Sequence, residues 1–120
     1  MITLKTPPVP INQKYGVYRG RMLLQAKYRN TKEALALEMR SQINHAPLEE
    51  ELVLSVMIYL GTKRKTDIDA FLKILMDAGE GVLYENDNQV TELHIYKHYN
   101  KENPRVELEY KKILKNLNEF

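Results

Sequence analysis

The sequence predicts an α+β fold in which a small mixed β-sheet carries helices on one face. An apolar run rich in Val and Ile over residues 52–60 is typical of a central, largely buried strand. Residues 90–99 alternate between apolar and polar side chains as a second strand does. Between these runs, apolar residues recur at helical spacing. A chain of 120 residues without internal repeats or a Gly/Ser-rich linker fits one domain over residues 1–120.

The N-terminal part is expected to contain an edge strand and a helix. Residues 2–5 form the edge strand, and the prolines within residues 7–10 then force an extended passage. Thr31 is a suitable N-cap for a helix over residues 31–44, because apolar residues gather on one face of that segment. Pro47 stops this helix before the central strand begins.

A second helix is predicted after the basic run of residues 63–65. Its apolar residues follow i, i+3, i+4 and i+7 spacing, and Gly79 or Gly81 marks its end. Thr66 or Asp67 serves as the N-cap. The apolar stripe consists of Ile68, Phe71, Leu72 and Leu75.

The rest of the chain is expected to complete the sheet. Residues 82–84 form a short strand before the polar turn of residues 85–88, and the strand of residues 90–99 follows. Residues 106–110 form the last strand. A basic amphipathic tail over residues 111–120 is helical or frayed.

Composition excludes several classes of protein. The chain has no cysteine, which excludes disulfides, cysteine zinc sites and thiol nucleophiles and suits a reducing cytosol. The longest apolar run, residues 52–60, is about half of the ~20 residues that a bilayer span requires. No secretion signal is recognisable among the first ten residues. We therefore expect a cytoplasmic protein with no membrane partner and, since no Walker A or dinucleotide glycine motif is present, no nucleotide cofactor.

Charge is segregated along the chain although its net value is only +2. Residues 1–40 contain eight Lys or Arg against two acids, whereas residues 74–93 contain five acids and no Lys or Arg. Such alternation is typical of a protein that binds phosphate backbones around an acidic reaction centre. It is also common on solvated surfaces, so charge alone leaves both interpretations open.

Three of the four aspartates lie at the ends of predicted elements. Asp67 and Asp69 begin the predicted helix, and Asp87 lies in the turn between two predicted strands. Residues at i and i+2 point about 200° apart on a helix, so Asp67 and Asp69 converge only if Asp67 precedes the first turn. Lys73 lies one turn beyond Asp69 on the same face. The alternative is that the acids cap the helix and stabilise its dipole by about 0.3 to 1 kcal/mol.

Two groups of cations are candidates for contacts with nucleic acid. Lys63, Arg64 and Lys65 adjoin the acids that must meet a phosphate. A second group is interleaved with tyrosines whose rings could stack on unpaired bases, and a solvated surface with half-buried tyrosines is its alternative. This group comprises Lys14, Arg19, Arg21, Lys27 and Arg29, beside Tyr15, Tyr18 and Tyr28. His94 and His98 would lie ~13 Å apart in a strand and cannot share a metal ion.

Residues 63–97 resemble the signature of the RusA-type Holliday junction resolvases, which are often found in phages and prophages. The family pattern is a basic run, Asp-x-Asp-Asn, a helix with Lys four residues after the second Asp, a later Asp, then Asp-Asp-x-Gln, Leu and Lys. Residues 8–12 are similar to the family's Pro-rich N-terminal segment. Ala70 stands where the family has Asn, and Asn86 replaces the first acid of the Asp-Asp pair. The ordered matches are Asp67, Asp69, Lys73, Asp77, Asp87, Gln89, Leu93 and Lys97.

The resemblance implies a homodimeric, Mg²⁺-dependent endonuclease that cuts two strands of a four-way DNA junction symmetrically, with Mn²⁺ as an expected substitute. It assigns metal binding and catalysis to Asp67, Asp69 and Asp87, and charge neutralisation at the scissile phosphate to Lys73. Lys97 joins the residues expected to bind DNA. Residue chemistry agrees, because three carboxylates in close proximity repel one another unless a cation lies among them.

Two alternatives remain open at this point. The departures at Ala70 and Asn86 suggest a branched nucleic-acid binding module that has kept the fold and lost useful catalysis. A metal-dependent nuclease acting on flaps or single strands is the other. The retained acids favour the resolvase, since carboxylates beside a basic run repel phosphate and have no use in a simple DNA binder.

Overall fold

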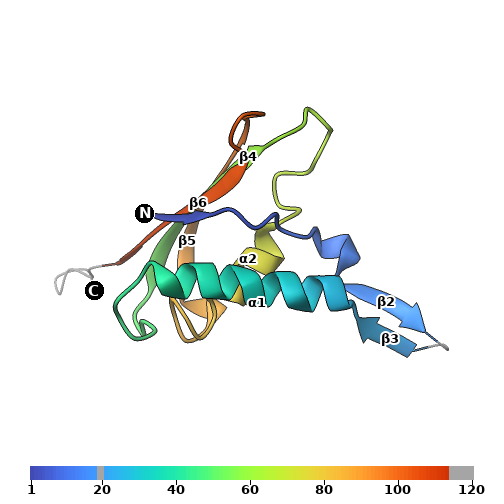
Figure 1. Cartoon of the computed structure of the whole chain (residues 1–120). Coiled ribbons are helices and arrows are strands. Elements are labelled where there is room, and N and C mark those ends of the chain that lie inside the picture. The colour runs from blue at the N-terminus through green and yellow to red at the C-terminus, as the bar shows by residue number, and fades with distance from the viewer. Residues whose placement is uncertain (19–20, 114–120) are drawn as a thin grey trace.

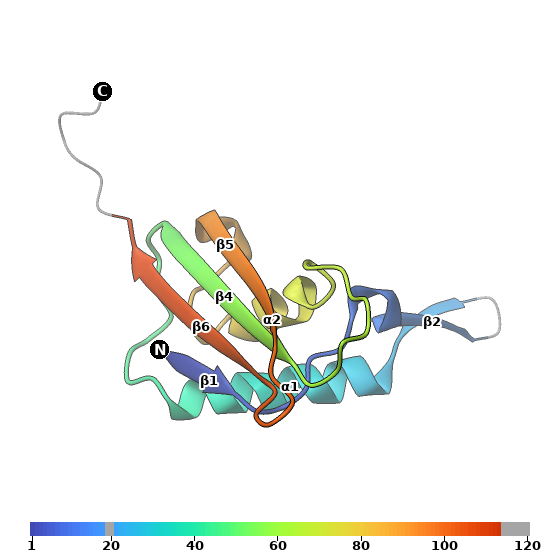
Figure 2. The same cartoon turned by 90° about the horizontal axis from the view of Figure 1, so that it is seen from above.

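A mixed four-stranded β-sheet organises the chain, and two α-helices lie on one of its faces (Figures 1 and 2). The computed structural model describes residues 1–18 and 21–113, with the backbone alone for residues 13, 15, 18 and 21–24. The α+β class and the placement of the helices are as predicted. In spatial order the strands are β1 (Ile2–Leu4), β6 (Arg105–Lys112), β4 (Leu52–Leu60) and β5 (Val90–Tyr99).

The strand pairing makes the segment between β4 and β5 a crossover connection. β5 runs parallel to β4, whereas β6 pairs antiparallel with both β4 and β1. A parallel pair needs a crossover connection, which here is the segment containing α2 (Leu72–Gly79) and the 3-10 helix η2 (Asp87–Gln89). All the aspartates of the chain therefore lie in one crossover.

The remaining elements come from the N-terminal part of the chain. The 3-10 helix η1 (Ile11–Gln13) leads into a hairpin of β2 (Tyr15–Tyr18) and β3 (Arg21–Leu24), and α1 (Ala26–Ser41) follows. Figure 1 shows the hairpin projecting away from the sheet beyond the first turn of α1.

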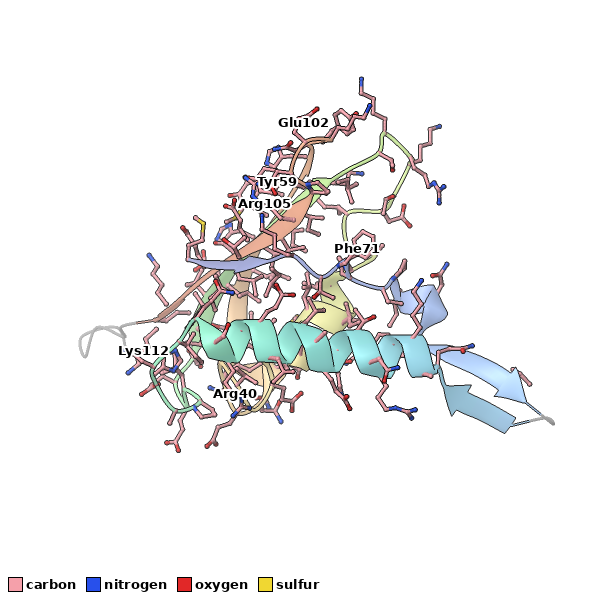
Figure 3. All side chains as sticks on the ribbon, in the orientation of Figure 1. Arg40, Tyr59, Phe71, Glu102, Arg105 and Lys112 are labelled. Carbon is pink, nitrogen blue, oxygen red and sulfur yellow. The ribbon has the colours of Figure 1, made fainter. Side chains whose placement is uncertain are left out.

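The core lies between the sheet and the two helices. Every second residue of β4 is buried against the helices, from Leu52 to Ile58. The intervening residues face the uncovered side, where the Arg105 guanidinium lies 3.9 Å from the centre of the Tyr59 ring (Figure 3). β4 is therefore central, as predicted, but only one of its faces is fully buried. Helix residues in the core include Leu35 and Met39 of α1 and Ile74 and Leu75 of α2.

Both helices begin at other residues than predicted. α1 begins at Ala26 instead of Thr31 and ends at Ser41, because buried Tyr28 anchors an additional first turn against the body. α2 ends at Gly79 as predicted but begins only at Leu72. The Ala70 and Leu72 amides donate to the carbonyl oxygens three residues earlier, at 3.0 and 3.1 Å, so residues 67–71 form tight turns. The N-cap prediction for Thr66 or Asp67 is therefore wrong.

Residues 82–84 form a turn where a short strand was predicted. Gly81 has a φ of 83°, which favours glycine, and the Leu83 amide donates to the Gly79 carbonyl oxygen at 2.8 Å. The apolar side chains of this turn are nevertheless buried in the core.

The strands of residues 90–99 and 106–110 are confirmed, and β6 extends to Lys112. The first residues of the predicted tail thus continue the sheet, and residues 114–120 lie outside the described residues. Within the described part of the chain, neither helix is long and apolar enough to cross a bilayer.

Candidate active site

Asp67 and Asp69 lie in the segment between β4 and α2, with exposed side chains. Two contacts hold the backbone of this segment. The Ile11 amide donates to the Ala70 carbonyl oxygen at 2.9 Å, and Lys97 Nζ donates to the Thr66 carbonyl oxygen at 2.5 Å. Strand β5 and the N-terminal segment therefore jointly position the stretch that contains both aspartates.

Asp87 is the first residue of η2, and a capping box holds this short helix. The Asn86 side chain accepts from the Asn88 amide at 3.0 Å, and Gln89 Oε1 accepts from the Asn86 amide at 2.7 Å. Gln89 Nε2 also donates to the Leu48 and Glu50 carbonyl oxygens at 2.7 and 2.9 Å. Asn and Asp are about equally good N-caps, so Asn86 caps this turn as well as an aspartate would.

The structure gathers Asp87 with two acids from the end of α2. Single carboxylate oxygens of Asp77, Glu80 and Asp87 lie within 4.8 Å of one another, and among the described residues these three form the one such group of potential metal ligands. Asp67 and Asp69 are not members of this group. Of the predicted metal ligands the group thus contains Asp87 alone, and metal binding by Asp67, Asp69 and Asp87 together stays a prediction.

The sequence contained a signal that Asp77 and Glu80 lie together. Residues at i and i+3 are neighbours on a helix, so an Asp and a Glu in the last turn of a predicted helix should lie side by side. The following turn at Gly81 brings Asp87 back toward them.

Asp77 is the most strongly held of these acids. Tyr28 donates to Asp77 Oδ2 at 2.5 Å, Lys14 Nζ lies 3.5 Å from the same oxygen, and Lys73 Nζ lies 3.0 Å from Oδ1. Burial by itself would raise the pKa of the Asp77 carboxyl, but hydrogen bonds from Tyr28 and Lys73 and the charges of Lys73 and Lys14 hold it below its ordinary value. Because Tyr28 is only 1% exposed, the prediction that its ring is available to stack on bases is wrong.

Lys73 forms an ion pair with Asp77, one of the three acids of the group. The hydrogen bond to Asp77 and the Asp77 charge raise the pKa of Lys73, and the charges of Asp87 and Glu80 add to this effect. The ammonium group is therefore positively charged at neutral pH. Its side chain is 44% exposed, so a phosphate can reach it. Because α2 begins at Leu72, Asp69 precedes the helix, and the predicted shared helix face of Lys73 and Asp69 does not form.

Tyr84 is buried against the last turn of α2. Its hydroxyl donates to the Met76 carbonyl oxygen at 2.7 Å. Burial raises the pKa of Tyr84, and the negative charges of Asp87, Glu80 and Asp77 raise it further. The phenol thus stays protonated and keeps its hydrogen bond to the last turn of α2.

The cations predicted to bind DNA lie in different surroundings. Lys63, Arg64 and Lys65 are exposed in the segment between β4 and α2, and Lys63 Nζ lies 5.2 Å from the centre of the Tyr99 ring. Lys97 is also exposed, although its ammonium group contacts the Thr66 carbonyl oxygen. Their contact with DNA stays a prediction.

The predicted cations near the hairpin are described only in part. Lys14 is largely buried and pairs with Asp77, so its ammonium group already has an anionic partner. Arg19 lies outside the described residues, and so does the side chain of Arg21.

The oxygen atoms of Glu80 and Asp87 suit a hard divalent cation, because carboxylate oxygens are the ligands that Mg²⁺ and Mn²⁺ prefer. Both oxygens of Asp77 already have partners in Tyr28, Lys14 and Lys73. Glu80 is exposed and Asp87 is partly exposed, so a phosphate can approach the group from solvent. An acidic group with an adjacent ammonium group suits the hydrolysis of a phosphate ester.

Two comparisons relate the chain to known proteins. A family model described as endodeoxyribonuclease RusA matches residues 5–111. A protein from Aquifex aeolicus (strain VF5), named crossover junction endodeoxyribonuclease RusA, is 33% identical over 93 residues, which cover 75% of this chain and 73% of that protein. The family match includes the whole crossover with its four aspartates.

Proposed function

Because the chain belongs to the RusA family of endodeoxyribonucleases, we propose that it resolves four-way DNA junctions by hydrolysing one phosphodiester bond in each of two strands. The observation that carries the proposal is the position of Asp87, which lies with two further carboxylates beside the Lys73 ammonium group. The name of the Aquifex relative supports the junction as the substrate.

We propose that Asp87, with Asp67 and Asp69, holds Mg²⁺, and that Mn²⁺ can replace it. When bound, such an ion supplies Lewis-acid polarisation of a phosphate oxygen and lowers the pKa of a water molecule. Glu80 adds negative charge that attracts the cation to Asp87. The side chains of Asp67 and Asp69 are exposed, so they can change rotamer without breaking core packing.

In this proposal Lys73 stabilises charge on the scissile phosphate. Its Nζ atom lies 3.0 Å from Asp77 Oδ1. The Asp77 contact and the negative charge of Asp87 raise the pKa of Lys73, so the ammonium group stays protonated. A preorganised cation beside the reacting phosphate opposes the negative charge that develops during hydrolysis. Lys63, Arg64 and Lys65 bind the flanking backbone, together with Arg19, Arg21 and Lys97 of the predicted set. The Lys14 ammonium group is paired with Asp77 instead.

We propose that two copies form a C2 dimer, since one acidic site supplies one nick and a junction requires two. On β4, the apolar side chains of the covered face, from Leu52 to Ile58, are buried beneath the helices and are not available as the contact. Strand β5 is a better candidate, because it is an edge strand with exposed Leu93, Tyr96 and Tyr99. Long exposed edge strands favour pairing with another chain.

The function is tested with a labelled four-way junction and a linear duplex of the same sequence, each with and without Mg²⁺. We expect paired nicks in the junction, dependent on Mg²⁺, and little cleavage of the duplex. Asp87→Asn should abolish the nicks, whereas Glu102→Gln, in the loop between β5 and β6, should leave them unchanged (Figure 3). Tight junction binding without cleavage would indicate the catalytically weak module. Cleavage of a labelled flap substrate, with the junction left intact, would indicate the other nuclease class.

A further inference from the structure

We propose that Asp77 is a positioning residue that holds the Lys73 ammonium group beside Asp87, and that Tyr28 fixes Asp77 for this task. This inference rests on the proposed function, because the role of Lys73 belongs to it. It gives Asp77 a different role from the other two acids of the group, Glu80 and Asp87.

The first step is the saturation of the Asp77 carboxylate by donors. Oδ2 accepts from the Tyr28 hydroxyl and faces the Lys14 ammonium group, while Oδ1 pairs with Lys73. To bind a metal ion, Asp77 would have to give up some of these donors, and two of them are cations that repel a metal ion. Asp77 is therefore suited to hold Lys73 and poorly suited to be a metal ligand.

The second step is the rigidity of the support. Tyr28 is 1% exposed, and its hydroxyl reaches Asp77 from α1, which packs against α2. The Tyr84 hydroxyl pins the Met76 carbonyl oxygen, next to Asp77 in the chain. Asp77 is thus fixed both through its side chain and through the backbone of its helical turn.

The third step is the exposure of the Lys73 side chain, which Asp77 restrains. The Lys73 side chain is 44% exposed, compared with 15% for Asp77. An exposed lysine side chain visits many rotamers unless a partner restrains it. Because an exposed i, i+4 pair alone stabilises a helix by only a few tenths of a kcal/mol, the buried anchor of Asp77 is what makes this restraint effective.

A double-mutant cycle under single-turnover conditions at saturating junction DNA tests the proposal. Asp77→Asn should lower the cleavage rate by about tenfold or more with little change in affinity, and Tyr28→Phe should lower it less. In a Lys73→Ala background, Asp77→Asn should lower the cleavage rate by less than about twofold, because the ammonium group that Asp77 positions is already absent. The Mg²⁺ concentration for half-maximal rate should stay unchanged.

The opposite results would overturn the proposal. If Asp77→Asn lowered the rate as strongly in the Lys73→Ala background as in the wild type, or raised the Mg²⁺ requirement, Asp77 would be a metal ligand. Should Asp77→Asn fail to fold, Tyr28→Phe carries the same test, since it removes one hydroxyl and keeps the ring. Tyr59→Phe, on the uncovered face of the sheet, is the matched control and should have no effect.

A measurement independent of cleavage separates this inference from the proposed function. Proton–nitrogen NMR of lysine ammonium groups should show a slowly exchanging Lys73 signal that disappears in Asp77→Asn and weakens in Tyr28→Phe. An unchanged signal would refute the positioning role even in an active enzyme. Failure of wild-type cleavage, together with a loss of the signal in Asp77→Asn, would refute the nuclease function and leave the Asp77–Lys73 arrangement intact.

Discussion

Lys97 of β5 donates a hydrogen bond to the carbonyl oxygen of Thr66 at 2.5 Å, directly before Asp67 in the chain. β5 begins at Val90, just after the 3-10 helix that contains Asp87. Lys97 is the eighth residue of that strand and pairs with Ile58 near the end of β4. This contact therefore holds the backbone that leads into Asp67 and Asp69 against the far part of β5.

Replacing Lys97 by Met should lower the cleavage rate by about tenfold at saturating DNA, because the Asp67 segment loses its tether to β5. Lys97→Arg keeps a donor and should retain most of the rate. Single-turnover cleavage and fluorescence anisotropy of junction binding measure the two effects. A loss of affinity alone, with a salt dependence flattened by about one counterion, would show instead that Lys97 contacts phosphate.

Replacing Asp67, Asp69 or Asp87 by Asn, one at a time, should abolish cleavage and leave junction binding unchanged or tighter. Removal of a negative charge weakens cation binding and reduces repulsion of the DNA phosphates. Calorimetric titration with Mn²⁺ and gel-shift assays in the absence of metal measure both effects, with Glu102→Gln as the control. Equal losses of binding and cleavage would indicate that the residue supports folding.

Lys73→Ala should lower the cleavage rate by about ten to a thousandfold with little change in affinity, because one charge-stabilising donor is lost. Lys63→Ala and Arg64→Ala should behave oppositely, with weaker binding and a salt dependence flattened by about one counterion each. Rates at saturating DNA and affinities over a range of salt concentrations distinguish the two classes. Near-wild-type cleavage by Lys73→Ala would remove Lys73 from the active site.

Glu38 should make folding stability depend on pH. Its carboxylate accepts from the Lys5 and Thr6 amides at 2.7 and 2.9 Å, which ties the segment after β1 to α1. Burial by itself would raise the pKa of Glu38, but hydrogen bonds from Thr6 and Lys5 and the Lys5 charge lower it below 4.5. The stabilisation is therefore present above about pH 4.5 and is lost as the pH falls through the lower pKa of the folded state.

Glu38→Gln should thus lower the free energy of unfolding by ~1 kcal/mol at neutral pH and by less at acid pH. Urea denaturation of the wild type and the variant at both pH values measures the difference. Glu33→Gln, which removes an exposed carboxylate from the same helix, is the control. A difference that stayed constant with pH would show that the ionised carboxylate makes no contribution.

Sedimentation at micromolar concentration should give twice the 14.1 kDa mass of one chain. If β5 forms the contact, Tyr96→Glu should produce monomers, because it places a charge beside the exposed edge. Leu37→Glu changes an apolar residue of α1 that is 67% exposed and should leave the dimer intact. A monomer that stayed monomeric on junction DNA would exclude paired nicking by a dimer.

The sequence alone determined the strands of the four-stranded sheet and the end of α2, but neither strand of the β2–β3 hairpin. β4 and β5 were predictable because strand periodicity and β-branched composition are local properties. Gly79 ends α2 for a similarly local reason. The ordered motif from Asp67 to Lys97 identified the family, which the match over residues 5–111 confirms.

Only the tertiary structure decided where the helices begin and which acids meet. Tyr28 becomes a buried donor to Asp77 because α1 packs on α2, a contact between residues 49 positions apart. The same packing places the start of α1 at Ala26. The tight turns of residues 67–71 place the start of α2 at Leu72, later than predicted. Asp77, Glu80 and Asp87 meet because Gly81 reverses the chain and the capping box at Asn86 fixes η2. Local patterns specify strands and helix ends, whereas burial and convergence depend on which surfaces pack together.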